Sequence, residues 1–131
     1  MTSRLFTLEE ARAALPEVKV LAERLVESRA DQLAASARLV ELRTVVAGNG
    51  HRGDGELAEA ARAVDDANVR IQAALGALSE LGVVVKSIDA GLVDFLSVRG
   101  GEEVCLCWQL GEPDIGFWHG LEAGFAGRQP L

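Results

Sequence analysis

Two stretches of the chain repeat apolar residues at intervals of three and four, the spacing of one face of an α-helix. The first stretch carries two adjacent apolar rows: Val18, Leu25, Leu39, Val46 and Leu21, Ala35, Leu42. The second stretch carries two more: Leu57, Val64, Ile71, Leu78 and Ala60, Ala67, Ala74, Leu81. We therefore expect helices over about residues 16–47 and 56–81, joined by the glycine-rich loop 48–55 into an antiparallel coiled-coil hairpin.

The chain before the first long helix has a helix-start signal of its own. Thr7 and Glu10 form a capping box, in which each side chain accepts a hydrogen bond from the other residue's amide. Pro16 lacks an amide hydrogen and disfavours helical geometry at Leu15, so we expect a kink or a break there. With these first turns included, the helical hairpin covers about residues 8–81.

After Gly82 the pattern changes to that of β-strands. Val83 to Ile88 is a β-branched run, and two alternating segments, 92–99 and 102–110, flank Gly100-Gly101, a typical two-residue hairpin turn. Facing residues of this hairpin then have numbers that sum to 201, which places Asp94 directly across from Cys107. The opposite face is bulky and apolar and holds Val93, Phe95, Leu106 and Trp108.

The last segment, residues 111–131, has little periodicity, and we expect irregular structure with one short helix near Trp118. The predicted fold class is α+β: a long antiparallel two-helix hairpin, a small antiparallel β-region and an irregular C-terminal tail. The β-region and tail occupy about residues 83–131. The length favours a single domain, residues 1–131.

Composition narrows the classes of function. The chain has 13 basic and 20 acidic residues, a formal net charge of −7, and no two basic residues are adjacent, so we expect no nucleic-acid partner. No stretch approaches the roughly 20 apolar residues that cross a bilayer, so we expect no membrane partner and a cytoplasmic protein. The two cysteines, Cys105 and Cys107, are expected to stay reduced, because residues two apart on a strand form only a strained disulfide.

Several short motifs resemble one family, the domain of unknown function 2203. These are Phe6-Thr7-Leu8-Glu9-Glu10-Ala11, Gly91-Leu92-Val93-Asp94-Phe95, Leu106-Cys107-Trp108, Leu110-Gly111-Glu112-Pro113, Trp118-His119 and Gly124-Phe125-Ala126-Gly127-Arg128-Gln129. The resemblance covers nearly the whole chain, and the last 40 residues carry its most specific part. It implies the fold and brings no established activity.

Asp94, Cys107 and His119 are the side chains that a zinc or iron site would use. Their spacing matches no known ligand signature, but the hairpin register brings the first two together, and the glycines after Cys107 allow His119 to fold back over the same face. Glu112, Glu122 or water would complete the set. In the structural alternative, Cys107 is a packed thiol, Asp94 accepts backbone amides and His119 caps the Trp118 segment.

A small polar ligand is the other possibility for this region, with Glu112, Trp118 and Arg128 as its contacts. The Arg128 guanidinium could clamp a carboxylate of a ligand or of this chain, and an internal pair with Glu112 or Glu122 is the simpler use. Trp118 is more often a core anchor than a ligand platform.

The sequence itself names no activity, and two kinds of function stay open. The first is a non-enzymatic assembly or adaptor module, because a further apolar row on the first helix, Val26, Leu33 and Val40, exceeds what one neighbouring helix covers. Such a protein would form a homo-oligomer, most simply a dimer, or bind another protein, unless the C-terminal segment covers that row. The second is a metal- or small-ligand-binding protein, an enzyme included, whose site uses the polar hairpin face and the Trp118-His119 segment.

Overall fold

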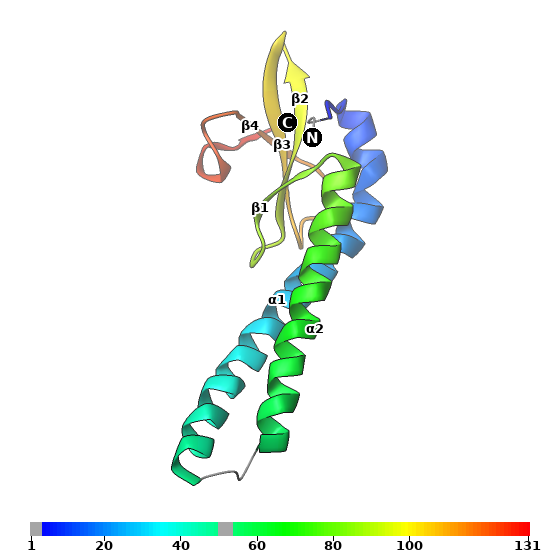
Figure 1. Cartoon of the computed structure of the whole chain (residues 1–131). Helices are drawn as coiled ribbons and strands as arrows, with labels where there is room; N and C mark the ends of the chain where they lie inside the picture. Colours follow the sequence, from blue (N-terminus) through cyan, green and yellow to red (C-terminus); the bar gives the residue numbers. More distant parts are fainter. Residues whose placement is uncertain (1–3, 50–53) are drawn as a thin grey trace.

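A computed structural model describes residues 4–49 and 54–131 of the chain; residues 50–53, within the predicted loop, lie outside the described residues. The helices α1 (Leu8–Asn49) and α2 (Asp54–Leu81) lie side by side and run antiparallel (Figure 1). A five-stranded antiparallel sheet follows, in the order β1 to β5. Its elements are β1 (Val84–Ser87), β2 (Leu92–Arg99), β3 (Glu102–Gln109), β4 (Phe117–Gly120), the 3-10 helix η1 (Phe125–Gly127) and β5 (Gln129–Pro130). The α+β class and the helical hairpin are thus confirmed.

The start of α1 confirms the capping box and corrects the expected break at Pro16. The Thr7 amide donates to Glu10 Oε1 at 2.9 Å, and the Glu10 amide donates to Thr7 Oγ1 at 3.0 Å. The helix continues through Pro16. Pro16 has no amide hydrogen to donate to the carbonyl of Arg12, four residues earlier. Both residues are exposed, so water can solvate that carbonyl instead. The buried neighbours Leu15 and Val18 hold the helical phase through their packing.

The β2–β3 hairpin has the register that the sequence predicts. Its pairs run from Leu92 with Gln109 to Arg99 with Glu102, and Asp94 lies across from Cys107. The turn residues Gly100 and Gly101 have φ values of 60° and 82°. A two-residue turn with positive φ at both positions matches the twist of the strands that it joins, which is why glycine is favoured at both.

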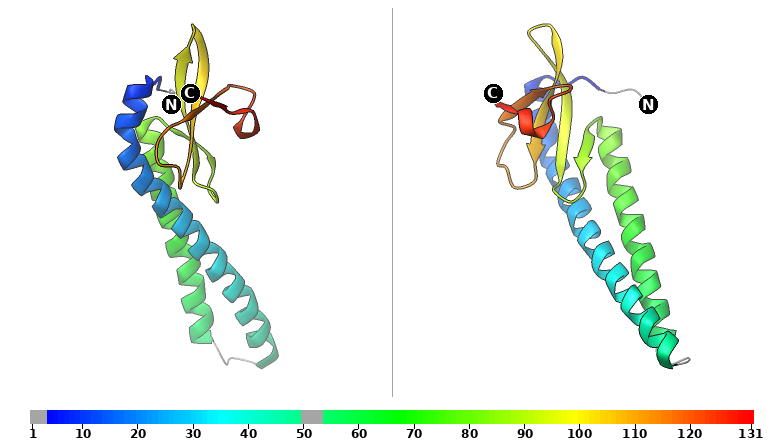
Figure 2. Two further views of the ribbon diagram at one scale, coloured as in Figure 1. Left: turned by 180° about the vertical axis from the view of Figure 1, so that it is seen from behind. Right: turned by 90° about the vertical axis from the view of Figure 1, so that its left-hand side faces the viewer.

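The tail is more ordered than the sequence pattern indicated, and the expectation of a short helix near Trp118 is wrong. Residues 117–120 form β4, which pairs with β3, and Gln129 and Pro130 form β5 against β4. The polypeptide after β4 lies on the side of the sheet away from the helices (Figure 2). A four-residue strand has too few positions for a periodic signal, and only its pairing with β3 defines it.

The apolar core lies where the sheet meets the helices. The apolar face of the hairpin packs against the first part of α1 and the last part of α2. The segment before α1 joins this core, because the Phe6 amide donates to the Leu96 carbonyl at 2.7 Å and the Phe6 ring meets Phe95 edge-on at 5.2 Å. The core residues of α1 end at Leu25, and those of α2 begin at Ile71. The rest of the hairpin projects beyond the sheet (Figure 1).

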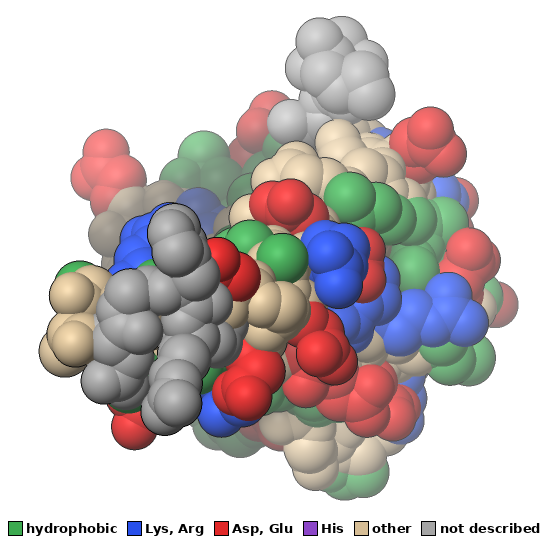
Figure 3. Space-filling model, turned by 60° about the horizontal axis from the view of Figure 1, so that its bottom comes forward, with side chains coloured by type: hydrophobic (Ala, Val, Ile, Leu, Met, Phe, Trp, Pro, Cys, Tyr) green, Lys and Arg blue, Asp and Glu red, His purple; other side chains and the backbone are tan. Residues whose placement is uncertain are grey.

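Acidic and basic side chains are interspersed on the face seen in Figure 3, with smaller hydrophobic areas between them. Ion pairs link the two helices, including Arg38 with Glu56 at 3.2 Å and Arg70 with Asp31 at 2.9 Å. Within the described ranges, no helix has the length and apolar character that a membrane span requires.

Candidate functional site

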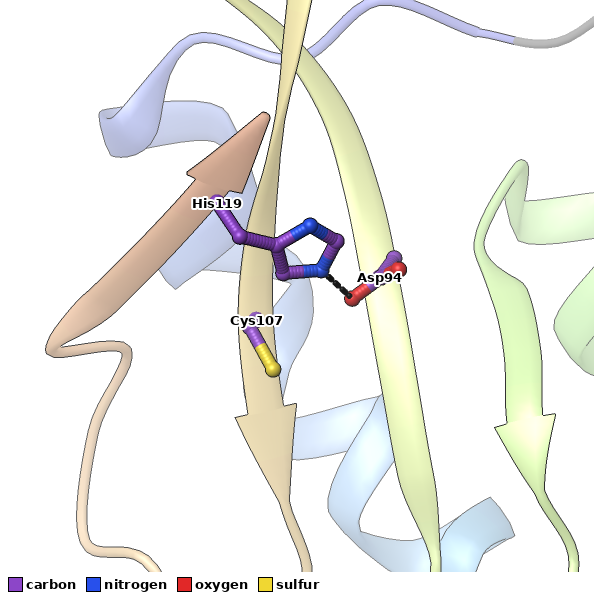
Figure 4. Close-up of side chains that lie close together, drawn as sticks. All are labelled: Asp94, Cys107 and His119. Carbon is purple, nitrogen blue, oxygen red and sulfur yellow. Dashed lines mark hydrogen bonds and ion pairs between the residues drawn. The ribbon is translucent and has the colours of Figure 1, made fainter. Parts of the chain in front are cut away.

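Three side chains from three neighbouring strands meet on the sheet face that points away from the helices (Figure 4). Asp94 comes from β2, Cys107 from β3 and His119 from β4, and one ligand-type atom of each lies within 4.8 Å of the other two. The three residues are 2%, 0% and 2% exposed. Two cross-strand pairs produce this arrangement: Asp94 faces Cys107, and His119 faces Cys105, two residues earlier on β3. The predicted convergence of these three residues is therefore present in the structure.

The hydrogen bonds of His119 define which ring nitrogen carries a hydrogen. Nδ1 lies 2.7 Å from the Gly120 carbonyl oxygen, which can only accept, so Nδ1 donates. Nε2 lies 3.1 Å from Asp94 Oδ1. In a neutral imidazole Nε2 then presents a lone pair toward a carboxylate oxygen, and two acceptors do not attract each other. A proton or another cation has to lie between these two atoms.

Asp94 is the least satisfied member of the group. Its Oδ2 is buried and has no nitrogen or oxygen donor in the described part of the chain; the thiols of Cys105 and Cys107 are the weak donors that interact with this carboxylate. The structural alternative in which Asp94 accepts backbone amides is thus wrong, since the partner of its Oδ1 is the imidazole of His119. A buried carboxylate oxygen with only weak donors is destabilising unless a cation or a ligand compensates it.

The environment of the two thiols disfavours their thiolate form. Burial, and next the negative charge of Asp94, raise the pKa of Cys107 to about 12. The same two causes, in the same order, raise the pKa of Cys105 to about 11. Both cysteines are free rather than joined in a disulfide. A thiol with so high a pKa is a poor nucleophile, but a metal ion would displace its proton.

The three residues predicted to contact a small ligand have other partners. Arg128 forms an ion pair with Glu112, which confirms the internal pair. The other oxygen of Glu112 accepts the Gln109 amide at 2.8 Å. Because both oxygens have partners, Glu112 is not available as a further metal ligand. Trp118 alternates with His119 along β4, and its ring packs against the core on the helix side of the sheet. Trp118 is therefore a core anchor, and its ring lies on the opposite face of β4 from His119.

Two phenylalanines near the site have a role that the sequence reasoning missed. The Arg128 guanidinium lies 3.8 Å from the centre of the Phe117 ring and 4.6 Å from that of Phe125. Phe117 is also the direct cross-strand partner of Cys107. The spacing of two between Phe117 and His119 could have indicated that they share a face, but the segment was not expected to be a strand.

The fold and the site define a class of protein: a helical hairpin carries a small antiparallel sheet, and the outer face of that sheet holds a buried Asp-Cys-His group. The chain belongs to the family described as uncharacterized conserved protein (DUF2203), whose model matches residues 4–131. This confirms the resemblance of its motifs. Comparison with curated proteins and with solved structures gave no match. The family has no established function, so a function has to be argued from the site.

Proposed function

We propose that this protein binds one divalent transition metal ion, best matched by zinc, through Asp94, Cys107 and His119. The observation that carries the proposal is the contact between His119 Nε2 and Asp94 Oδ1, a place for a proton or a metal ion, beside a neighbouring thiol that is a metal-ligand type and a carboxylate oxygen that lacks a nitrogen or oxygen donor. Carboxylate, thiolate and imidazole are all zinc ligands, and a zinc ion serves each of them at once.

The distances support a site that closes slightly around the ion. Ligand atoms of a tetrahedral zinc ion lie about 3.4–3.8 Å apart, given bonds of about 2.0–2.3 Å. The three candidate atoms lie within 4.8 Å of one another. Side-chain movements of about 1 Å therefore bring them to the spacing of zinc ligands. The hydrogen bond from Nδ1 to the Gly120 carbonyl is the second-shell contact that typically orients a metal-bound histidine.

The burial of the group favours a held metal over a reactive one. Each of the three residues is almost fully covered, and a catalytic zinc site needs a position open to substrate. A fourth ligand from solvent would have to enter when the tail moves. We therefore assign the metal a binding and stabilising role, and we favour a protein that is not an enzyme.

The test is metal uptake by the purified full chain, first stripped with a chelator and then dialysed against zinc or cobalt(II). We expect one ion per chain by elemental analysis, and a cobalt spectrum with a thiolate charge-transfer band. His119→Ala and Cys107→Ser should each abolish uptake. Cys105→Ser is the matched control, because it removes a buried thiol from the same strand face and should leave uptake unchanged. Absent uptake in the wild type, or uptake that survives Cys107→Ser, would refute the proposal.

A second candidate function is self-association through α1, as an assembly or adaptor module. Leu33 is 51% exposed and Val40 is 62% exposed, and the tail lies over the sheet and does not cover them. Val26, the first member of that row, is already half-buried next to Gly91. The apolar surface left on the projecting hairpin is of the kind that packs in a four-helix arrangement between two copies.

Light scattering at tens of micromolar tests this candidate. A dimer mass for the wild type and a monomer mass for Val40→Glu would support it. Val69→Glu is the matched control, since Val69 is 68% exposed on α2 and lies outside the row. A monomeric wild type would exclude self-association as the function.

A further inference from the structure

A half-buried ion pair helps to hold the segment after β4 over the outer face of the sheet. The Arg128 side chain is 11% exposed, lies on the rings of Phe117 and Phe125, and is paired with Glu112. Glu112 is fixed in turn, because it accepts the amide of Gln109, the last residue of β3. The contact therefore ties the tail to the strand that carries Cys107.

The rest of the tail has few other contacts that would hold it down. Residues 121–127 are exposed or half-buried, β5 pairs with β4 over two residues, Phe117 with Pro130 and Trp118 with Gln129, and the Leu131 amide donates to the Gly116 carbonyl at 2.9 Å. The Phe125 ring is itself 45% exposed. A segment that buries so little apolar surface opens locally unless a strong polar contact holds it.

We propose that the Arg128–Glu112 pair, called here the clamp, controls access from solvent to the buried face of Asp94, Cys107 and His119. Contacts between neighbouring side chains connect the clamp to the buried group, since Arg128 lies on the ring of Phe117, and Phe117 is the cross-strand partner of Cys107. When the clamp opens, the tail and the side chain of Phe117 can move away while the backbone of β4 stays paired with β3, and Cys107 becomes open to solvent. Arg128 and Glu112 are thus positioning residues that do not touch the metal. The part of this inference that concerns metal exchange rests on the proposed metal site.

The first test uses metal-free protein and the reaction of Cys107 with a disulfide reagent such as DTNB. In a Cys105→Ser background Cys107 is the sole thiol, and because it is buried its reaction rate reports the population of the open state. Lysine keeps the charge but lacks the planar fork and the stacking surface of arginine. Arg128→Lys and Glu112→Gln should each accelerate the reaction about tenfold, as expected for loss of a charge-assisted hydrogen bond.

Arg99→Lys provides the matched control. Arg99 lies 4.7 Å from the centre of the Trp118 ring, so it makes a similar contact on the other face of the same strand. The control should leave the reaction rate of Cys107 unchanged. A Cys107→Ser background leaves Cys105 as the reporter, which should react at an unchanged rate when the clamp is broken, because β4 stays in place.

The outcomes separate a local opening from a general loss of stability. Faster reaction of Cys107 alone, with an unchanged urea midpoint, supports the clamp. Equal acceleration of both thiols with a lowered midpoint, or no acceleration in either variant, overturns it. If the wild type binds cobalt, the same variants should release it to a chelator about tenfold faster. If the wild type binds no metal, the metal proposal fails, and the thiol reaction alone decides whether the clamp exists.

Discussion

Replacement of Asp94 by asparagine separates the role of its charge from the role of its shape. With hydrogen on Nδ1 of His119, Nε2 can accept a hydrogen bond from the new side-chain amide. The variant therefore keeps the contact to His119 and needs no extra cation. It also removes a buried carboxylate whose Oδ2 has no nitrogen or oxygen donor among the described residues. Without metal, Asp94→Asn should change the free energy of unfolding by less than ~1 kcal/mol, in the stabilising direction if at all.

Asp94→Ala is the comparison that gives the magnitude. It leaves the Nε2 atom of a histidine that is 2% exposed without a partner, and it opens a small cavity. Loss of a buried partner costs about 1–3 kcal/mol, and the cavity adds to that loss. We expect Asp94→Ala to be about 2 kcal/mol less stable than Asp94→Asn.

Urea unfolding with a chelator, and then with zinc, provides the assay. At zinc concentrations 100 times the dissociation constant, the wild type should gain about 2.7 kcal/mol. For a chain of 131 residues that corresponds to roughly 10 °C in melting temperature. Asp94→Asn should gain none of this. If metal-free Asp94→Asn were as unstable as Asp94→Ala, the carboxylate charge would hold the fold without a metal, and our reasoning would be wrong.

Three further predictions concern single parts of the fold. The pKa of Cys107 is raised to about 12 and that of Cys105 to about 11, so on raising the pH the unfolded chain loses its thiol protons before the folded chain does. The free energy of unfolding should therefore fall as pH rises above about 9. Cys107→Ser should make this fall less steep in urea titrations from about pH 8 to 10. Gly101→Ala, at a φ of 82°, should lower the free energy of unfolding by about 1 kcal/mol, whereas Gly116→Ala, at a position with open space, should leave it nearly unchanged. Thr7→Ala should lower it by about 1 kcal/mol because the cap of α1 is lost. An equal loss in Thr44→Ala, a control near the other end of α1 whose hydroxyl donates to the Val40 carbonyl, would contradict that cause.

The parts of the fold that the sequence predicts are those with local signals. The apolar rows define both helices, and Gly100-Gly101 alone fixes a register in which Asp94 faces Cys107. The position of His119 had a weaker basis, since it rested only on flexible glycines between the two residues. Pairing of β4 with β3 is what brings His119 into the group, and that pairing joins segments across a connection with no periodic pattern.

The errors have the same origin in contacts between distant residues. Pro16 is a local signal for a helix end, but the packing of Leu15 and Val18 against the core outweighs it. For Trp118 the sequence favoured a core anchor over a ligand contact but could not say which face of the chain its ring takes. In a strand, adjacent residues point to opposite faces, so recognition of β4 would have separated Trp118 from the face of His119.

The position of the core at one end of the helical hairpin has a consequence for how the chain can vary. Because core residues of α1 end at Leu25 and those of α2 begin at Ile71, the part of the hairpin between them is not needed to shape the sheet. Two antiparallel helices keep their facing side chains in phase when each gains or loses seven residues. The hairpin can therefore change length by two turns at a time, or accept an inserted peptide near residue 50, while the Asp94-Cys107-His119 group keeps its geometry. The reach of the molecule and the chemistry of its sheet can thus evolve independently.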